Sequence, residues 1–248
     1  MTEAEWLASE EPEPMLAAAQ EISERKALLI GCGCCRTCAS EIVLDEFHRA
    51  TELLERAADG LATDEEYFDA HRIANYALDL CTGTAPWIPS RYKTSNSLAG
   101  AWAVRELAAR NWDCVPRENS WDRYSRPKQT PTILVAVTRA IANLECVGST
   151  PGTDVMHQPR AVRGIVRVIH DIVGNPFRPV AFSPEWRTDT TIALARAMYE
   201  SREFSAMPIL ADALQDAGCD NDEVLNHCRE PGTHVRGCWV VDLVLGKS

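Results

Sequence analysis

Apolar residues recur at spacings of three and four along most of the chain, with polar and charged residues between them. This period matches one face of an α-helix, and no stretch of alternating apolar and polar residues makes a convincing β-strand. The pattern predicts an all-α protein, an irregular multi-helix bundle of roughly ten helices. The expected helices cover residues 15–27, 27–39, 44–58, 63–80, 97–110, 131–144, 160–173, 188–203, 209–217, 221–228 and 238–245.

Residues with a preference for helix ends delimit several of these helices. Gly60 suits a left-handed C-cap, and Thr63 with Glu66 three residues later is the capping-box pattern at the start of the next helix. Gly174 is placed to end the helix over 160–173. Prolines 176 and 179 disfavour helix in the residues before them, so we expect a turn there.

The segment 111–130 interrupts the helical pattern, because it is rich in tryptophan, arginine and proline. We expect a loop over these residues. A chain of 248 residues suits one large domain, and we predict a single helical domain over 1–248. In the alternative arrangement, the loop joins two lobes over 1–110 and 131–248.

Composition excludes several classes of protein. Hydrophobic residues make up 46% of the chain, which is enough for a core and excludes wholesale disorder. No apolar run approaches the roughly 20 residues of a membrane-spanning helix. The N-terminus lacks the basic start and apolar stretch of a signal peptide, so a cytoplasmic protein without a membrane partner is expected. The net charge of −11 argues against general nucleic-acid binding, which needs a basic face.

Residues 81–150 differ from the rest, because they carry 9 basic and 5 acidic side chains and four of the seven tryptophans. Basic side chains interleaved with aromatic rings can bind single-stranded nucleic acid, and Trp121 and Arg123 are the candidate residues for such an interaction. The small charge excess favours another interpretation, in which this segment docks against the acidic N-terminal part of the chain.

Four cysteines, Cys32, Cys34, Cys35 and Cys38, lie within seven residues inside a predicted helix. The Cys-x-x-Cys spacing is typical of zinc and redox sites, but no second pair with this spacing follows. At about 100° per residue, the last three of these cysteines fall on the apolar face of the helix. We therefore interpret the cysteines as core residues, with metal ligation and a reactive thiol as the alternatives.

A second group of thiols and imidazoles lies near the C-terminus. His227 and Cys228 end one predicted helix, and His234 and Cys238 follow the turn at 231–232. Two ligands on each side of a turn can close a tetrahedral metal site. Adjacent helical side chains diverge by about 100°, so only one of His227 and Cys228 is expected to join the others. The candidate ligands are Cys228, His234, Cys238 and Cys219.

Zinc is the candidate cofactor of this group. The interpretation we favour needs no cofactor, since the histidines can bond backbone carbonyls at helix ends while the cysteines pack in the core.

The turn predicted around residue 176 offers a different kind of site. Asn175, Phe177 and Arg178 bring polar groups and an aromatic ring to one exposed turn, which suits an anion or a peptide. Asp171 precedes the turn, and we expect an Asp–Arg pair to hold the turn against the last helix.

Catalytic motifs are missing from the sequence, which has no P-loop, no dinucleotide-binding glycine motif, no His-Glu-x-x-His and no Gly-x-Ser-x-Gly. No catalytic residue is assigned, and the hypothesis we favour is a non-enzymatic helical protein-interaction or regulatory module that binds another protein. The alternatives are a zinc-binding protein and a weak single-stranded nucleic-acid binder. A thiol-dependent enzyme would need a cysteine with a lowered pKa.

Several stretches share a pattern with other proteins. Residues 31–36 read Gly-Cys-Gly-Cys-Cys-Arg, residues 175–180 read Asn-Pro-Phe-Arg-Pro-Val, residues 210–214 read Leu-Ala-Asp-Ala-Leu, and residues 234–242 read His-Val-Arg-Gly-Cys-Trp-Val-Val-Asp. Together they resemble a bacterial family that is abundant in planctomycete genomes and has no assigned biochemical function. The resemblance leaves residues 81–155 unmatched. It implies that the two ends of the chain form a common framework, and it transfers no catalytic residue.

Overall fold

The structure is a computed structural model that describes residues 1–19, 22–37, 42, 44–82, 95–108, 137, 140, 141, 144 and 159–247. Every regular element within these residues is a helix, which confirms the prediction of an all-α protein. The α-helices are α1 (Glu3–Leu7), α2 (Pro12–Ala18), α3 (Glu24–Thr37), α4 (Asp45–Ala58), α5 (Asp64–Thr82), α6 (Ser95–Ala108), α8 (Pro159–Val173), α9 (Asp189–Ser201), α10 (Met207–Asp216), α11 (Asp222–Arg229) and α12 (Trp239–Leu245). None of the described helices combines the length and hydropathy that crossing a membrane requires.

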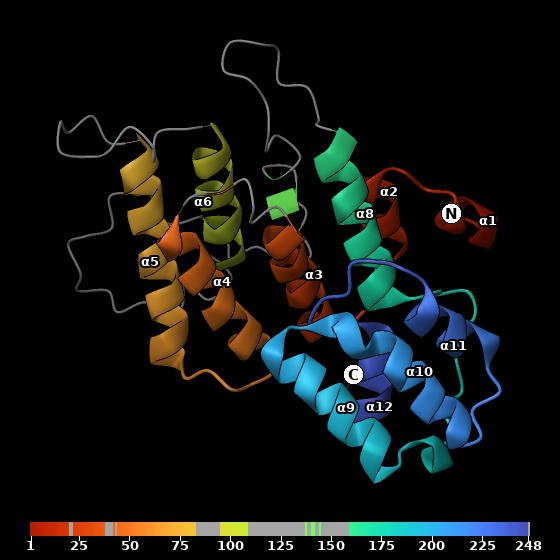
Figure 1. The fold of residues 1–248 in the computed structure, drawn as a ribbon. Helices are drawn as coiled ribbons and strands as arrows, with labels where there is room; N and C mark the ends of the chain where they lie inside the picture. The colour runs from red at the N-terminus through yellow and green to blue at the C-terminus, as the bar shows by residue number, and fades with distance from the viewer. Residues whose placement is uncertain are drawn as a thin grey trace.

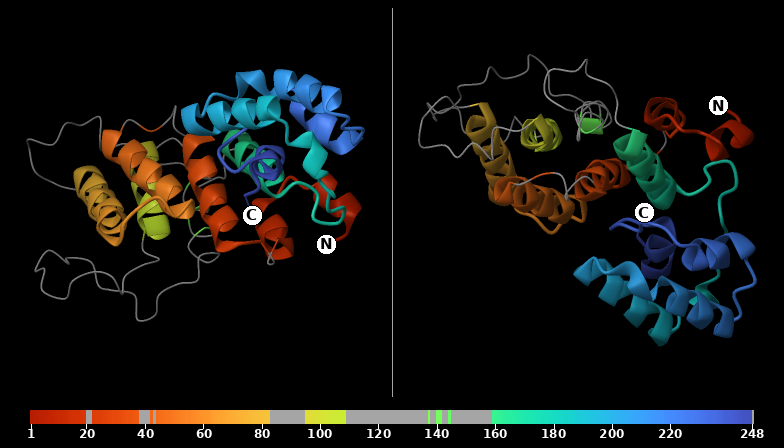
Figure 2. Two further views of the ribbon diagram at one scale, coloured as in Figure 1. Left: turned by 90° about the horizontal axis from the view of Figure 1, so that it is seen from below. Right: turned by 45° about the horizontal axis from the view of Figure 1, so that its top comes forward.

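The helices fall into two groups, each built around its own hydrophobic cluster (Figure 1). In the N-terminal group, α3, α4, α5 and α6 pack side by side, and α8 packs against α3. In the C-terminal group, α9 to α12 gather along one side of α8 and α3, as both views of Figure 2 show. The loop predicted over 111–130, and with it the boundary between two lobes, lies outside the described residues.

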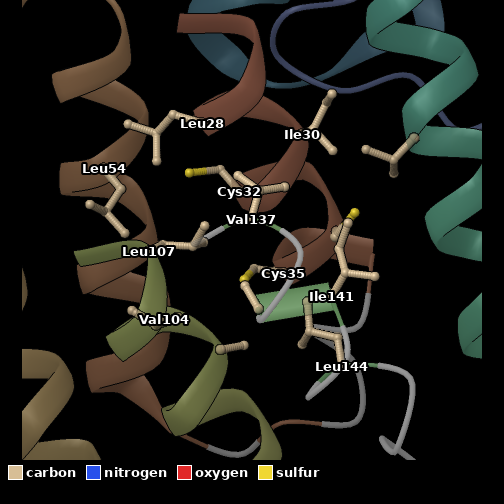
Figure 3. Close-up of a cluster of buried hydrophobic side chains, with 14 of the residues drawn as sticks. Leu28, Ile30, Cys32, Cys35, Leu54, Val104, Leu107, Val137, Ile141 and Leu144 are labelled. Atoms are coloured by element: carbon tan, nitrogen blue, oxygen red, sulfur yellow. The ribbon is translucent and has the colours of Figure 1, made fainter. Parts of the chain in front are cut away.

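Cysteines of α3 belong to the core of the N-terminal group. Cys32, Cys34 and Cys35 are buried and form no disulfide. Figure 3 shows Cys32 and Cys35 among apolar side chains from α3, α4 and α6, including Leu54 and Leu107. Burial raises the pKa of the Cys32 thiol well above its usual value, so this thiol stays neutral. The interpretation of these three residues as core is confirmed, whereas position 38 lies outside the described residues.

A glycine in α3 sets how closely this helix approaches α8. A Cβ at Gly33 would lie 2.8 Å from Cγ1 of Val168 in α8 and 3.0 Å from Cγ2 of Val235. Real Cβ atoms essentially never lie closer than 3.0 Å to such an atom, so α8 can approach α3 this closely because residue 33 has no side chain, and the contact with Val235 would also be tight.

Local sequence signals define most helix ends as predicted. Gly60 has φ +68° after α4, which confirms its left-handed conformation. The capping box at the start of α5 is also confirmed, because Thr63 N donates to Glu66 Oε2 at 2.9 Å and Glu66 N donates to Thr63 Oγ1 at 3.2 Å. Asn221 caps α11 by accepting a hydrogen bond from Val224 N.

The prediction of one helix over 15–27 is wrong. Helix α2 ends at Ala18, and α3 begins at Glu24. Ser23 Oγ accepts a hydrogen bond from Lys26 N at 3.3 Å, which satisfies one of the free amides at the start of α3. Ser23 therefore starts a new helix, although the apolar periodicity of the sequence continues across this position.

A buried carboxylate connects the two groups of helices. Asp59 follows α4, and its side chain is fully shielded from solvent. It accepts hydrogen bonds from Arg25 Nε of α3 at 2.9 Å, Tyr199 OH of α9 at 2.7 Å, and Arg236 Nη2 at 2.6 Å. Arg25 also pairs with Asp242 of α12 at 2.7 Å. Since α9 and α12 belong to the C-terminal group, these bonds fix its position on α3 and α4.

Candidate metal centre

Four potential metal ligands converge where α8, α11 and the start of α12 meet. They are Asp171, His227, His234 and Cys238, and their ligand atoms all lie within 4.8 Å of one another. Asp171 is in the last turn of α8, His227 is in the last turn of α11, and Cys238 is the N-cap of α12. Gly237 has φ +96°, a conformation that glycine adopts readily, and this turn leads the chain from His234 into Cys238.

Distances between the ligand atoms describe a compact group. Nδ1 of His234 lies 2.7 Å from Oδ1 of Asp171, and Nε2 of His227 lies 3.2 Å from the same oxygen. The Cys238 Sγ lies 3.2 Å from His227 Nε2 and 4.0 Å from His234 Nδ1. The other carboxylate oxygen of Asp171 accepts a hydrogen bond from Val235 N at 2.9 Å, which fixes the orientation of the carboxylate.

Asp171 and Cys238 of this group are buried, whereas the imidazoles of His227 and His234 are partly buried. Burial acts to raise the pKa of Asp171, but the hydrogen bonds from His227 and His234 outweigh it and hold that pKa below its usual value. Burial raises the pKa of the Cys238 thiol well above its usual value, and the charge of Asp171 raises it further. Asp171 is therefore ionised and Cys238 is a neutral thiol until a cation displaces its proton.

The donor set and its geometry fit a tetrahedral metal ion. Two imidazole nitrogens, one sulfur and one carboxylate oxygen are the donor types that zinc takes. Bond lengths of about 2.0–2.3 Å at tetrahedral angles place neighbouring ligand atoms roughly 3.2–3.6 Å apart. The four separations given above lie within roughly 0.6 Å of that range, and the other two are no longer than 4.8 Å, so side-chain adjustments could close the group around an ion. The group could therefore hold a metal ion.

The structure brings together two of the four ligands expected from the sequence. His234 and Cys238 are in the group, together with His227, which was the alternative to Cys228 in the expected set. The fourth residue, Asp171, was not among the expected ligands. The rule that adjacent helical residues diverge holds for His227 and Cys228, but the histidine is the one that faces the group. Asp171 lies 63 positions before His234, and no motif spacing connects residues so far apart.

Cys219 and Cys228 lie outside the group, in the hydrophobic cluster of the C-terminal helices. Burial raises the pKa of Cys228 to about 12, and it also raises the pKa of Cys219. Every cysteine of the described chain with a resolved shift has a raised pKa, which argues against a reactive thiolate there.

The turn after α8 forms contacts other than those predicted. Arg178 pairs with Glu3 at 2.6 Å and with Glu223 at 3.7 Å, and Asn175 Nδ2 donates to Glu3 Oε1 at 2.9 Å. Asp171 pairs with histidines instead, so the prediction of an Asp–Arg pair is wrong. Phe177 is 42% exposed on this turn.

The remaining candidates, Trp121 and Arg123, lie outside the described residues, so their proposed contact with nucleic acid stays a prediction.

Comparisons with known proteins give no match to a family model, to a curated protein or to a solved structure. The fold and the site by themselves define an all-α protein with an Asp/His/His/Cys group that could hold a metal ion.

Proposed function

We propose that this chain is a zinc-binding helical protein, and that zinc joins the end of α8 to α11 and α12 through Asp171, His227, His234 and Cys238. The observation that carries the proposal is the convergence of these four donor atoms, from three separate segments, within 4.8 Å of one another.

The donor types favour zinc over other common ions. Calcium and magnesium take oxygen ligands, six or more for calcium, whereas only one residue of this group offers oxygen. A thiolate and two imidazoles suit zinc, which accepts nitrogen, sulfur and oxygen ligands without a preference imposed by d-electrons. Copper(II) and nickel(II) with nitrogen and oxygen ligands favour square-planar or tetragonal arrangements. Blue-copper sites also combine two imidazoles with a thiolate, but their fourth ligand is a weak axial group such as methionine, whereas the fourth residue here is a carboxylate.

A structural role follows from the number of ligands. Catalytic zinc keeps an open position beside three protein ligands, whereas structural zinc is closed by four. Here the chain supplies all four, and Asp171 and Cys238 are buried. A zinc ion bound in this way acts as a cross-link between α8 and a loop more than 60 positions later in the chain.

The test is metal analysis of protein purified without chelators, combined with cobalt substitution. We expect about one zinc per chain in the native protein, and tetrahedral cobalt with a thiolate absorption band after exchange. Cys238→Ser should lose the metal. Cys228→Ser is the matched control, because Cys228 is buried in the same helical group but lies outside the ligand set.

Two results would contradict the proposal. Protein that binds neither zinc nor cobalt at neutral pH would show that the group is a hydrogen-bonded cluster, with Asp171 accepting from both imidazoles. Loss of metal from Cys228→Ser, with metal retained by Cys238→Ser, would assign the site to other residues.

A protein-interaction role, the hypothesis favoured by the sequence, is compatible with a structural metal and stays a prediction. The exposed ring of Phe177, on a turn fixed by Arg178 and Glu3, is one feature of the described chain that suits it.

A further inference from the structure

A cavity of about 170 Å³ lies beside the metal centre and shares one residue with it, His234. It opens between α3, the end of α4 and two segments of the C-terminal half, 202–204 and 233–236. Figure 1 shows the end of α9 beside the end of α4, where these segments meet. The cavity matches in size an apolar cavity of about 150 Å³ known to bind benzene, so it suits a small molecule.

Three arginines from different parts of the chain line the cavity. Arg36 of α3 and Arg202 both bond to the buried Glu55, with Nε–O distances of 3.0 and 2.7 Å. Arg236 bonds to Asp59. Within the described residues, the Nη1 groups of Arg36 and Arg202 form no hydrogen bond. Two guanidinium groups at the cavity are thus held in place by Glu55 and keep donors for another acceptor.

Positive charge exceeds negative charge around this cavity, although the whole protein has a net charge of −11. In the described part of the chain, five basic side chains accompany four buried carboxylates, an excess of one positive charge. The basic residues are Arg25, Arg36, Arg202, Arg236 and Lys247, and the carboxylates are Glu55, Asp59, Asp242 and Asp171. Glu52, the further partner of Arg202, is 55% exposed and screened by solvent. An anion bound in the cavity would offset this excess of positive charge.

The backbone of Arg202 gives an independent observation. Its φ of +62° makes it the sole described residue other than glycine with a positive φ. This position is the C-cap of α9, where glycine would be the unstrained choice. Strained backbone of this kind concentrates at ligand sites, because the function of the side chain outweighs the conformational cost.

Apolar groups also line the cavity. Phe204 and Val235 line it, together with the backbone of Gly33. A ligand that fills both regions needs a negatively charged planar head for the guanidinium groups and a compact hydrocarbon body.

We propose that this cavity binds a small organic carboxylate with an aromatic or branched aliphatic body. The proposal does not depend on zinc, since His234 is the one metal ligand that lines the cavity and the arginines are held by Glu55 and Asp59.

The experiment is calorimetric titration of the full chain with benzoate, isobutyrate and acetate, with benzamide as the neutral analogue of benzoate. We expect benzoate to bind, benzamide to bind at least tenfold more weakly, and added salt to weaken the binding of benzoate. Arg202→Gly should weaken the binding of benzoate at least tenfold. The variant should still fold, because glycine readily adopts the left-handed conformation of residue 202. Thr233→Phe, at an exposed position of the cavity wall, should abolish binding by filling the space without breaking an ion pair. Arg56→Gln, which removes an arginine paired with Glu66 away from the cavity, should leave the affinity unchanged.

Equal binding of benzoate and benzamide would overturn the proposal, as would unchanged benzoate affinity in Arg202→Gly or the absence of binding by all three carboxylates. Tighter binding of inorganic phosphate than of any carboxylate would overturn the assigned class of ligand. Zinc content is measured on every sample, and the titrations are repeated after chelation. Protein that contains no zinc as purified and takes up none, yet binds benzoate, would contradict the proposed metal site and support the cavity site.

Discussion

His234 Nδ1 lies 2.7 Å from Oδ1 of Asp171, although 63 positions separate the two residues in the chain. The same carboxylate accepts the Val235 amide through its second oxygen, so one aspartate at the end of α8 fixes both the ring and the backbone of the loop that precedes α12. This contact places a charged acceptor among two imidazoles and a thiol, and it defines the candidate metal centre.

Metal removal is expected to lower the thermal stability of the native protein. A ligand present at about 100 times its dissociation constant stabilises the folded state by about 2.7 kcal/mol, which corresponds to about 5–10 °C in Tm for a chain of this size. The measurement is a melting curve with and without a chelator. Cys238→Ser should show a lower Tm that the chelator does not change, whereas Cys228→Ser should still respond to the chelator.

Asp171→Asn tests the ligand that sequence spacing does not reveal. The amide keeps the shape of the side chain and an acceptor for Val235 N, but it removes the negative charge, so we expect zinc affinity to fall by at least tenfold. The measurement is a competition titration against a chromogenic chelator. Asp212→Asn is the matched control, because Asp212 is exposed and pairs with Arg229 away from the centre. Equal affinities of the two variants would exclude Asp171 as a ligand.

Zinc affinity is expected to rise with pH. Burial raises the pKa of Cys238 well above its usual value, so the thiol is protonated at neutral pH and binding must release its proton. One released proton corresponds to about a tenfold gain in apparent affinity per pH unit, measured between pH 7 and 8. A flat profile over this range would mean that the bound metal does not displace the proton of Cys238.

Asp59→Asn is expected to destabilise the fold by about 3–5 kcal/mol, since it leaves Arg236 without its buried anion and removes one of the two buried anions that pair with Arg25. Burial acts to raise the pKa of Asp59, but bonds from Tyr199, Arg25 and Arg236 outweigh it and hold the pKa below its usual value of 3.8. The stability that this carboxylate contributes is therefore complete above pH 3.8 and is lost as the pH falls from there through its folded pKa.

Urea unfolding of Asp59→Asn and of the native chain, at neutral pH and in acid, measures both effects. The difference in the free energy of unfolding between the two proteins should shrink in acid. Asp69→Asn is the control, because Asp69 forms an exposed pair with Arg72 and should change stability by less than about 1 kcal/mol.

Gly33→Ala is expected to cost about 1–3 kcal/mol by overpacking, because its Cβ would lie 2.8 Å from Val168 Cγ1. A Cβ at Gly232 meets no atom within 4 Å, so Gly232→Ala should change the free energy of unfolding little. Urea unfolding of both variants at neutral pH makes the comparison. Equal stabilities would show that α3 and α8 separate easily at this contact.

The sequence by itself determined the features that depend on neighbouring residues. The helical period identified the fold class, and Gly60, the Thr63–Glu66 capping box and Asn221 marked helix ends that the structure confirms. Cys34 and Cys35 could be assigned to the core because their positions on the apolar helix face follow from spacing alone. His234 and Cys238 could be grouped as candidate ligands because both follow the turn at 231–232 and lie four residues apart.

Tertiary structure decided everything that joins distant segments. It selected His227 over Cys228, added Asp171 from another helix, and placed Arg202 beside Glu55 of α4. Local signals predict helices because the hydrogen bonds of a helix join residues four apart. The partner of a side chain at the end of a helix depends instead on how whole helices pack. Packing is determined by the burial of many apolar residues together, and the spacing of these residues along the chain does not show which segments will meet.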